Sequence, residues 1–376
     1  RVLGSIALLG GAIAPLLTNA PSPDMTGLMT YIVFLNLGMF LVVFLRGWRE
    51  IIVLALLVTA AYSFGLDDIA SSSVQWFFMA LFYALFYGAS LSAAFRNRRI
   101  GMTDLLTTGG ISLLMIGWII GFVPEVWQGL ILALLAVVPV LITSLLQNQG
   151  FPRQIIYVHG AAGTLSLAVA TAIELSGEAL IVAFTIEILA LIALCRFVTK
   201  DQASARNLSF LLAIPTLLSV DHMESYMWRY SGSVLNEHFF ILLLLTAAFF
   251  ATAKLLSDRL NSQKTPKSSI LHLILGSIFA MLTIWRSMEF LLSYTWAHGV
   301  SLVIFTLAGL FFFFRGLRSE HKGPYFAGMA VLSFVALRLL LVEMWIMPLT
   351  GRIVFFALIG LLLLSTAFFL KQSHED

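Results

Sequence analysis

The stretch FVALRLLLVEMWIMPLTGR, residues 334–352, has the length and apolar content of a membrane-spanning helix, yet it contains two charged side chains. Arg338 lies deep inside the run, and Glu343 follows five residues later. A charge at the centre of a bilayer costs about 3 kcal/mol on the insertion-based scale. Arg338 therefore needs a partner on another helix, a water-filled cavity or a bound anion.

The rest of the chain has a similar composition. Of its 376 residues, 60% are hydrophobic and 11% are charged, whereas a soluble domain carries about 25% charged residues. Long apolar runs recur, and each approaches the roughly 20 helical residues that a hydrocarbon core requires. Lipid cannot satisfy backbone polar groups, and the runs lack the alternation of barrel strands. We therefore predict an all-α fold: a polytopic transmembrane helical bundle with short loops.

The apolar runs predict about fourteen spans. They lie near residues 2–18, 27–45, 50–66, 73–95, 104–122, 126–146, 154–174, 178–196, 205–220, 238–256, 269–287, 299–315, 324–345 and 351–370. We expect one integral-membrane domain over residues 1–376, with halves at 1–200 and 201–376, the second of which carries an outward polar cluster. The chain begins with Arg1 rather than Met, so we also expect it to be a piece of a longer protein.

The basic residues predict an orientation. Of the 22 Lys and Arg residues, all but Arg229, Arg286, Arg338 and Arg352 fall on one side of the predicted spans. An excess of Lys and Arg marks the cytoplasmic side of a membrane protein. The alternation therefore predicts a multi-pass protein of the inner (cytoplasmic) membrane with both termini in the cytoplasm.

Several other classes of function do not fit the sequence. The net charge of +3 is explained by these basic loops, so we expect no nucleic-acid partner. A single cysteine, Cys195, permits neither an internal disulfide nor a cysteine metal site. The chain has no phosphate-cradling glycine loop, paired-histidine zinc spacing or nucleophile elbow. We expect no metal and no cofactor, and it stays open whether the protein is an enzyme.

Acidic residues and histidines gather around the four arginines that break the charge pattern. We predict that they form an outward-open polar cavity that binds a substrate. Its candidate residues are Arg286, Glu289, His298, Arg338, Glu343 and Arg352. A second outward group lies in the stretch SVDHMESYMWRYSGSVLNEHF and consists of Asp221, His222, Glu224, Arg229, Glu237 and His238.

A structural explanation competes with a binding site. Arg286 and Glu289 are three residues apart and can pair on one helix. Arg338 and Glu343 lie about 140° apart on a regular α-helix, so they should not share a face. The partner expected for Arg338 is Glu187, Glu289 or the phosphate of a ligand. A buried pair between Arg338 and Glu187 would serve either function or helix packing.

Three stretches carry a resemblance to a known family. Residues 28–62 form a helix pair joined by an Arg-Trp turn, residues 165–197 form a helix pair with the mid-span Glu187, and residues 325–371 form a closing segment with Arg338, Glu343 and Arg352. Together they resemble the bacterial polytopic membrane proteins catalogued as domain of unknown function 2339. The resemblance implies many spans, often with more spans upstream, and implies no particular activity.

Two classes of function remain. The first is the binding, transport or transfer of an anionic or lipid-linked cell-envelope substrate, because arginine suits phosphate and carboxylate groups. The second is a non-catalytic membrane subunit, whose charges hold helices together or contact other subunits of a complex. Membrane lipids are expected partners in both cases.

Overall fold

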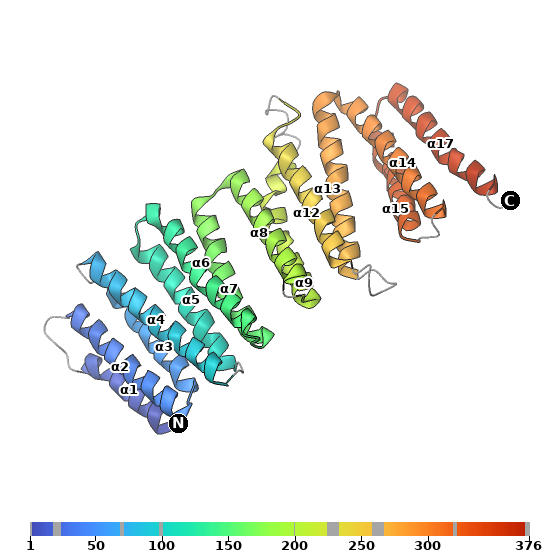
Figure 1. The fold of residues 1–376 in the computed structure, drawn as a ribbon. Helices are drawn as coiled ribbons and strands as arrows, with labels where there is room; N and C mark the ends of the chain where they lie inside the picture. Colours follow the sequence, from blue (N-terminus) through green and yellow to red (C-terminus); the bar gives the residue numbers. More distant parts are fainter. Residues whose placement is uncertain are drawn as a thin grey trace. The chain divides into compact units, whose positions relative to one another are not determined.

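The computed structural model describes residues 2–17, 24–67, 71–97, 101–198, 200–223, 233–257, 267–318 and 322–372. Within these ranges the chain is helical and has no strand, which confirms the predicted all-α class (Figure 1). The helices form two compact units, Arg1–Ser176 and Gly177–Asp376. The boundary between the units falls after residue 176, whereas the sequence suggested halves at 1–200 and 201–376.

The first unit is a series of antiparallel helices with short connections. Its elements are α1 Val2–Leu17, α2 Met25–Arg46, α3 Glu50–Tyr62, the 3-10 turn η1 Ser63–Leu66, α4 Ser72–Asn97, α5 Met102–Phe122, α6 Glu125–Asn148 and α7 Arg153–Glu174. The turn between α2 and α3 begins at Gly47, which has a φ of 72° and donates its N–H to Val43 O. Glycine adopts this left-handed conformation without steric cost and so ends α2.

The second unit begins with α8 and carries the residues around Arg338. Its elements are α8 Gly177–Phe197, α9 Gln202–Ser209, η2 Phe210–Leu212, α10 Ala213–Leu218, η3 Val220–Met223, α12 Glu237–Leu256, α13 Lys267–Leu291, α14 Tyr294–Arg318, α15 Lys322–Arg338, the π-helix η4 Leu339–Glu343, α16 Met344–Ile346 and α17 Leu349–Gln372. Asp201 caps α9 by accepting from the backbone N–H of Ala203 and Ser204. Asn236 caps α12 by accepting from the N–H of Phe239.

Ten helices in the described part of the chain are long and apolar enough to cross a membrane. Shorter apolar helices cover Gly4–Pro15, Glu50–Leu66 and Leu349–Leu364. The span predicted at 205–220 is divided between α9, η2, α10 and η3, and it contains Pro215, which lacks a backbone N–H. The predicted fourteen spans therefore exceed the ten that meet this length and hydropathy, although the membrane-protein class stands.

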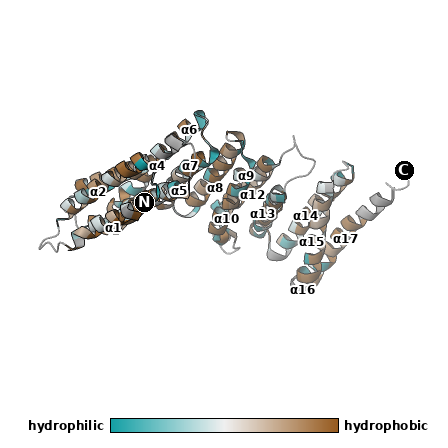
Figure 2. Cartoon of the chain, turned by 90° about the horizontal axis from the view of Figure 1, so that it is seen from below, coloured by the Kyte–Doolittle hydropathy of each residue, from teal (hydrophilic) through white to brown (hydrophobic). Residues whose placement is uncertain are grey.

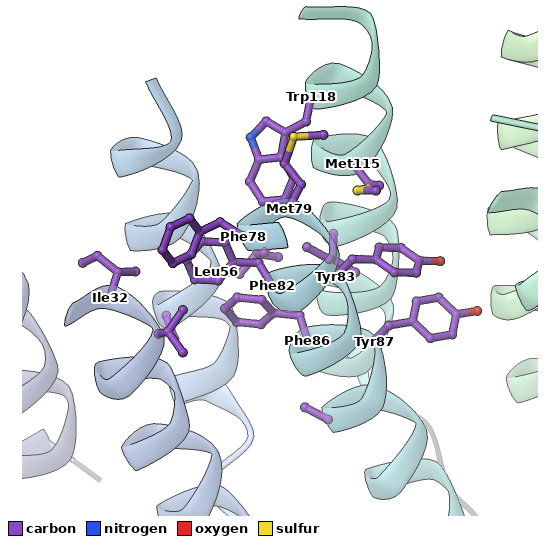
Figure 3. Packing of buried hydrophobic residues seen from close by; sticks show 14 of the residues in the cluster. Ile32, Leu56, Phe78, Met79, Phe82, Tyr83, Phe86, Tyr87, Met115 and Trp118 are labelled. Carbon is purple, nitrogen blue, oxygen red and sulfur yellow. The ribbon is translucent and has the colours of Figure 1, made fainter. Parts of the chain in front are cut away.

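Large aromatic side chains fill the core of the first unit (Figure 3). Phe78, Phe82 and Phe86 recur every four residues on α4, and all three are buried. Phe82 packs against Trp118 of α5 with ring centroids 6.2 Å apart. Four-residue spacing keeps these rings on one face of the helix, and Figure 3 shows Tyr83 and Tyr87 pointing to another side of it.

Glycines allow α14 and α15 of the second unit to approach closely. A Cβ atom added to Gly328 would lie 2.4 Å from Phe313 N and 2.7 Å from Gly309 O. One added to Gly316 would lie 2.3 Å from Tyr325 N. Small residues at such contacts are typical of helix pairs in membranes, where close backbone packing replaces the hydrophobic effect as the driving force. This packing sets the position of α15 and of the π-helix that follows it.

The helices remain apolar where they are exposed. Leu57, Phe326 and Leu361 are more than half exposed, and Figure 2 shows hydrophobic residues along most helices of both units. Such surfaces would drive aggregation in water but match the hydrocarbon core of a bilayer. The exposed side chains and the helix lengths together describe a multi-pass membrane protein.

Candidate functional site

Helix α13 contributes the first part of the site. Arg286 Nη1 donates to Glu289 Oε2 at 2.6 Å. Trp285 Nε1 donates to the other carboxylate oxygen, Glu289 Oε1, at 2.8 Å. Residues three and four apart are neighbours on a helical surface, and the predicted local pairing of Arg286 with Glu289 is confirmed. The Glu289 carboxylate is thus held by two donors from its own helix.

His298 of α14 joins α13 to the end of α15. Its Nε2 lies 3.1 Å from Glu289 Oε1, and its Nδ1 lies 3.1 Å from Glu343 Oε1. The side chain is 4% exposed, and its ring meets the Trp285 ring edge to face with centroids 5.2 Å apart. Helix α14 packs against both α13 and α15, which explains how one imidazole reaches carboxylates from two other elements.

Arg338 and Glu343 form an ion pair within one continuous helix, so the prediction that they face apart is wrong. Arg338 Nε donates to Glu343 Oε1 at 3.1 Å. The prediction assumed an α-helix, but Leu339–Glu343 is a π-helix. Hydrogen bonds from i to i+5 widen its turn, so residues five apart approach the same face. The expected pairing of Arg338 with Glu187 or Glu289 is replaced by this shorter-range pair.

The guanidinium of Arg338 also covers the indole of Trp285. Its Cζ lies 3.3 Å from the ring centroid, and its Nη2 lies 3.3 Å from His298 Nδ1. An arginine stacked on a tryptophan is stabilised by the negative face of the ring. Trp285 was missing from the predicted site, although its position four residues before Glu289 was a usable signal. We call the following six residues the charged cluster: Trp285, Arg286, Glu289, His298, Arg338 and Glu343.

Two buried polar atoms of the charged cluster lack a hydrogen-bond partner among the described residues. They are Nε of Arg286, a donor, and Oε2 of Glu343, an acceptor. Most buried polar groups in native proteins are hydrogen-bonded, so an unsatisfied atom calls for an explanation such as an unseen water, ion or ligand. Of the four side chains in these two ion pairs, that of Arg286 is the most exposed, at 21%, and that of Glu343 is the least exposed, at 1%.

The remaining predicted residues of the main site lie elsewhere. Arg352 stands in the first turn of α17 and donates from Nε to Met347 O at 2.7 Å, where it holds the connection after α16. Glu187 is half-buried on α8, which packs against α9, α10 and α12. The outward-open cavity predicted beside the charged cluster stays a prediction. In the structure the cluster residues contact one another directly.

The second predicted group yields a pair of buried histidines. His222 Nδ1 lies 2.6 Å from His238 Nδ1, and the ring centroids are 4.8 Å apart. Glu237 Oε1 lies 3.8 Å from His238 Nε2, whereas Asp221 is exposed. Glu224 and Arg229 lie outside the described residues. No group of three or more potential metal ligands occurs among the residues that the structure describes.

The first unit holds buried polar contacts that the site prediction did not include. Tyr87 Oη and His159 Nδ1 lie 2.8 Å apart, so His159 is a hydrogen-bonded histidine in the core of this unit. Arg49 and Asp104 form an ion pair at the helix ends. These pairs involve residues 72 and 55 positions apart in the chain, and no local pattern predicts such partners.

Comparison with known proteins agrees with this architecture. A family model described as predicted membrane protein (DUF2339) matches residues 1–302. The match includes the α13 part of the charged cluster and His298, and it ends before Arg338 and Glu343. No curated protein and no solved structure shows significant similarity to the chain. Because the match covers most of the sequence and the helices fit a multi-pass protein, the chain belongs to the DUF2339 family of predicted membrane proteins.

Proposed function

We propose that the protein binds the anionic head group of a lipid-linked cell-envelope compound at the charged cluster. The observation that carries this proposal is the buried Nε–H of Arg286, which has no acceptor among the described residues. Both oxygens of its own partner, Glu289, already receive donors: Trp285 on Oε1 and Arg286 Nη1 on Oε2. The Nε–H of Arg286 donates to neither of these oxygens, and a bound ligand can supply its acceptor.

An anionic oxygen suits this position. Arginine binds phosphate and carboxylate groups through two parallel N–H donors, and Nε is one donor of that fork. The Glu343 Oε2 acceptor is also unsatisfied, so a ligand that carries a hydroxyl beside its anionic group would complement both atoms. Apolar helix surfaces around the cluster suit the lipid part of such a ligand. The unsatisfied atoms of Arg286 and Glu343 support binding of the ligand. Transport or transfer of the ligand would be a later step.

Binding can be tested with the purified protein and short-chain phosphatidylglycerol, whose phosphodiester carries one negative charge. We expect this lipid to raise the thermal unfolding temperature, and short-chain phosphatidylcholine, which is zwitterionic, to do so less. The Arg286→Gln variant should bind the anionic lipid at least about tenfold more weakly, a loss of ~1.4 kcal/mol. Arg318→Gln is the matched control, because Arg318 is an exposed arginine in the last turn of α14.

Inorganic phosphate distinguishes a lipid head group from a free anion. Stabilisation by phosphatidylglycerol alone would identify a lipid-linked ligand, and equal stabilisation by inorganic phosphate would identify a soluble anion. Equal affinity of wild type and Arg286→Gln for the lipid would refute the binding site. The protein would then better fit a non-catalytic membrane subunit.

One observation favours the alternative function, that of a non-catalytic membrane subunit. His298 of α14 contacts a carboxylate of α13 and a carboxylate of the π-helix, each at 3.1 Å, and an arginine pairs with each of these carboxylates. Such pairs can fix helix packing without any ligand. Copurification of other membrane proteins with the chain, at constant stoichiometry and without bound lipid, would support this alternative. We place either function in the inner membrane, with both termini in the cytoplasm, from the distribution of Lys and Arg.

A further inference from the structure

His298 occupies an unusual position for a neutral histidine. Each of its ring nitrogens lies 3.1 Å from a carboxylate oxygen, Nε2 from Glu289 and Nδ1 from Glu343. A neutral imidazole has one N–H and one lone pair, so it can donate to one carboxylate only. With a second proton the imidazolium donates to both. The same heavy-atom positions therefore admit two protonation states of His298.

Arg338 makes the neutral state acceptable as well. Its Nη2 lies 3.3 Å from His298 Nδ1, and its Nε donates to Glu343 Oε1 at 3.1 Å. When Nδ1 carries no proton, it accepts from Arg338 Nη2. When Nδ1 is protonated, it donates to Glu343 instead, and Arg338 keeps its contacts with Glu343 and with the Trp285 ring. Neither state leaves a ring nitrogen of His298 without a hydrogen bond.

The two states differ in charge. The charged groups that face His298 are Arg286 and Glu289 from α13, Arg338 from α15 and Glu343 from the π-helix. Helix α17, which also packs against α14, brings Arg352, whose Nε donates to Met347 O. Two guanidinium groups balance the two carboxylates of the charged cluster, so the cluster is neutral with a neutral His298 and carries one positive charge with an imidazolium.

We propose that His298 takes up one proton when the anionic ligand binds. The inference rests on the proposed function, since the anion supplies the negative charge that offsets the imidazolium. The proton goes to Nδ1 and is shared with Glu343 Oε1. Coupling of this kind is reciprocal, so the anion favours the proton by the same factor as the proton favours the anion. The bound species is then an anion together with a proton, with no net charge added to the membrane.

Proton uptake can be measured directly on the wild-type protein. Short-chain phosphatidylglycerol is added in weak buffer with a pH indicator, because its phosphodiester does not titrate in this range. Histidine normally changes its charge between about pH 5 and pH 8. We expect about one proton per bound lipid at the upper end of that range and none at the lower end. The affinity for the lipid should fall by up to about tenfold per pH unit on the alkaline side.

Variants assign the proton to His298. His298→Gln retains a hydrogen-bonding side chain but cannot titrate, so it should bind the lipid without proton uptake and with an affinity independent of pH. His159→Gln, the same change at a buried histidine outside the cluster, should keep the uptake. If His298→Gln does not fold, Glu343→Gln answers the question, because an amide accepts from Nδ1 more weakly than a carboxylate and should move the uptake to lower pH.

The outcomes separate this inference from the proposed function. Lipid binding without proton uptake over the whole pH range would overturn the inference and leave the binding site intact. Proton uptake that persists in the His298→Gln variant would also overturn the inference, since another group would then bind the proton. A lack of lipid binding at any pH would overturn the proposed function, and the coupled proton with it.

Discussion

Arg338 and Glu343 are five residues apart, and a hydrogen bond of 3.1 Å joins them because a π-helix lies between them. The pair brings a charge of each sign to the same face of one helix. His298 then reaches the pair from α14, and Glu289 reaches His298 from α13. With this spacing of five residues, the π-helix is what brings Arg338 and Glu343 together.

Removal of Arg338 should strand a buried carboxylate. The side chain of Glu343 is 1% exposed, so Arg338→Leu leaves it without its guanidinium partner. We expect the free energy of unfolding to fall by about 3–5 kcal/mol, the usual effect of breaking a buried ion pair. The double variant Arg338→Leu with Glu343→Leu should recover part of this loss. Unfolding of the purified variants in mild detergent measures both effects.

Glu187 supplies the control for that experiment. The sequence suggested it as the partner of Arg338, and its helix α8 packs against α9, α10 and α12. Adding Glu187→Leu to Arg338→Leu should therefore recover nothing. Recovery by Glu187→Leu but not by Glu343→Leu would show that the pair found here does not stabilise the protein.

Deletion of Leu341 should be tolerated. Leu341 is 68% exposed and lies inside the π-helix. A π-helix of one turn is equivalent to one extra residue in an α-helix, so the deletion leaves Arg338 and Glu343 four apart on a regular α-helix. The ion pair and its neighbours keep their places, and we expect stability to change by less than about 1 kcal/mol.

Deletion of Leu337 is the matched control for Leu341. Leu337 is 58% exposed and precedes Arg338. Its removal moves Arg338 to the place of Leu337, about 100° round the helix and away from Trp285. This deletion should be as destabilising as Arg338→Leu. If the two deletion variants unfold equally easily, the π-helix has no role in forming the ion pair between Arg338 and Glu343.

The contact between α14 and α15 should not accept a side chain at Gly328. A Cβ there would lie 2.4 Å from Phe313 N, a backbone atom that cannot move aside without separating the helices. Gly328→Ala should lower the free energy of unfolding by about 1–3 kcal/mol. Gly323 is on the same helix with open space around its Cβ position, so Gly323→Ala should be neutral or slightly stabilising. Thermal unfolding of both variants, side by side, tests the close approach.

Membrane topology can be tested with cysteines introduced at Asp67 and at position 264. The native Cys195, which is buried, is first changed to serine. The charge pattern predicts that the cysteine at 67 reacts with a membrane-impermeant reagent from outside, and that the cysteine at 264 reacts only after permeabilisation. Reaction of both positions from the same side would overturn the predicted orientation.

The sequence was most informative where one helix contains the whole pattern. Long apolar runs located the helices, and the spacing of Arg286 and Glu289 predicted their pairing, because each depends on residues within a few turns. The number of spans was predicted too high. The stretch around Pro215 and the short helix Glu50–Leu66 are apolar enough to suggest spans, but they do not form long regular helices. Hydropathy reports composition and does not report where a helix breaks.

Other features had no local signal. The residue types of Leu339–Glu343 do not distinguish a π-helix from an α-helix. The side of the helix on which Glu343 lies was therefore predicted wrongly. The contact between His298 and Glu343 joins residues 45 positions apart and depends on how α14 and α15 pack. That packing follows from close contacts such as the one at Gly328, which a sequence shows only as one more small residue.

The charged cluster is also arranged so that its helices can enter the bilayer one at a time. Helix α13 carries Arg286 with Glu289, and the segment from α15 to the π-helix carries Arg338 with Glu343. A lone charge at the centre of an inserting helix costs about 2.5–3.5 kcal/mol, but a helix with its charges already paired brings no net charge from them into the lipid. Between these two spans, α14 contributes only a histidine to the cluster, and this histidine is uncharged until it gains a proton. The arginines of α14 lie in its last turn. Each span can therefore leave the insertion machinery in chain order before its neighbour is made, and His298 links the two pairs once all three helices are in the membrane.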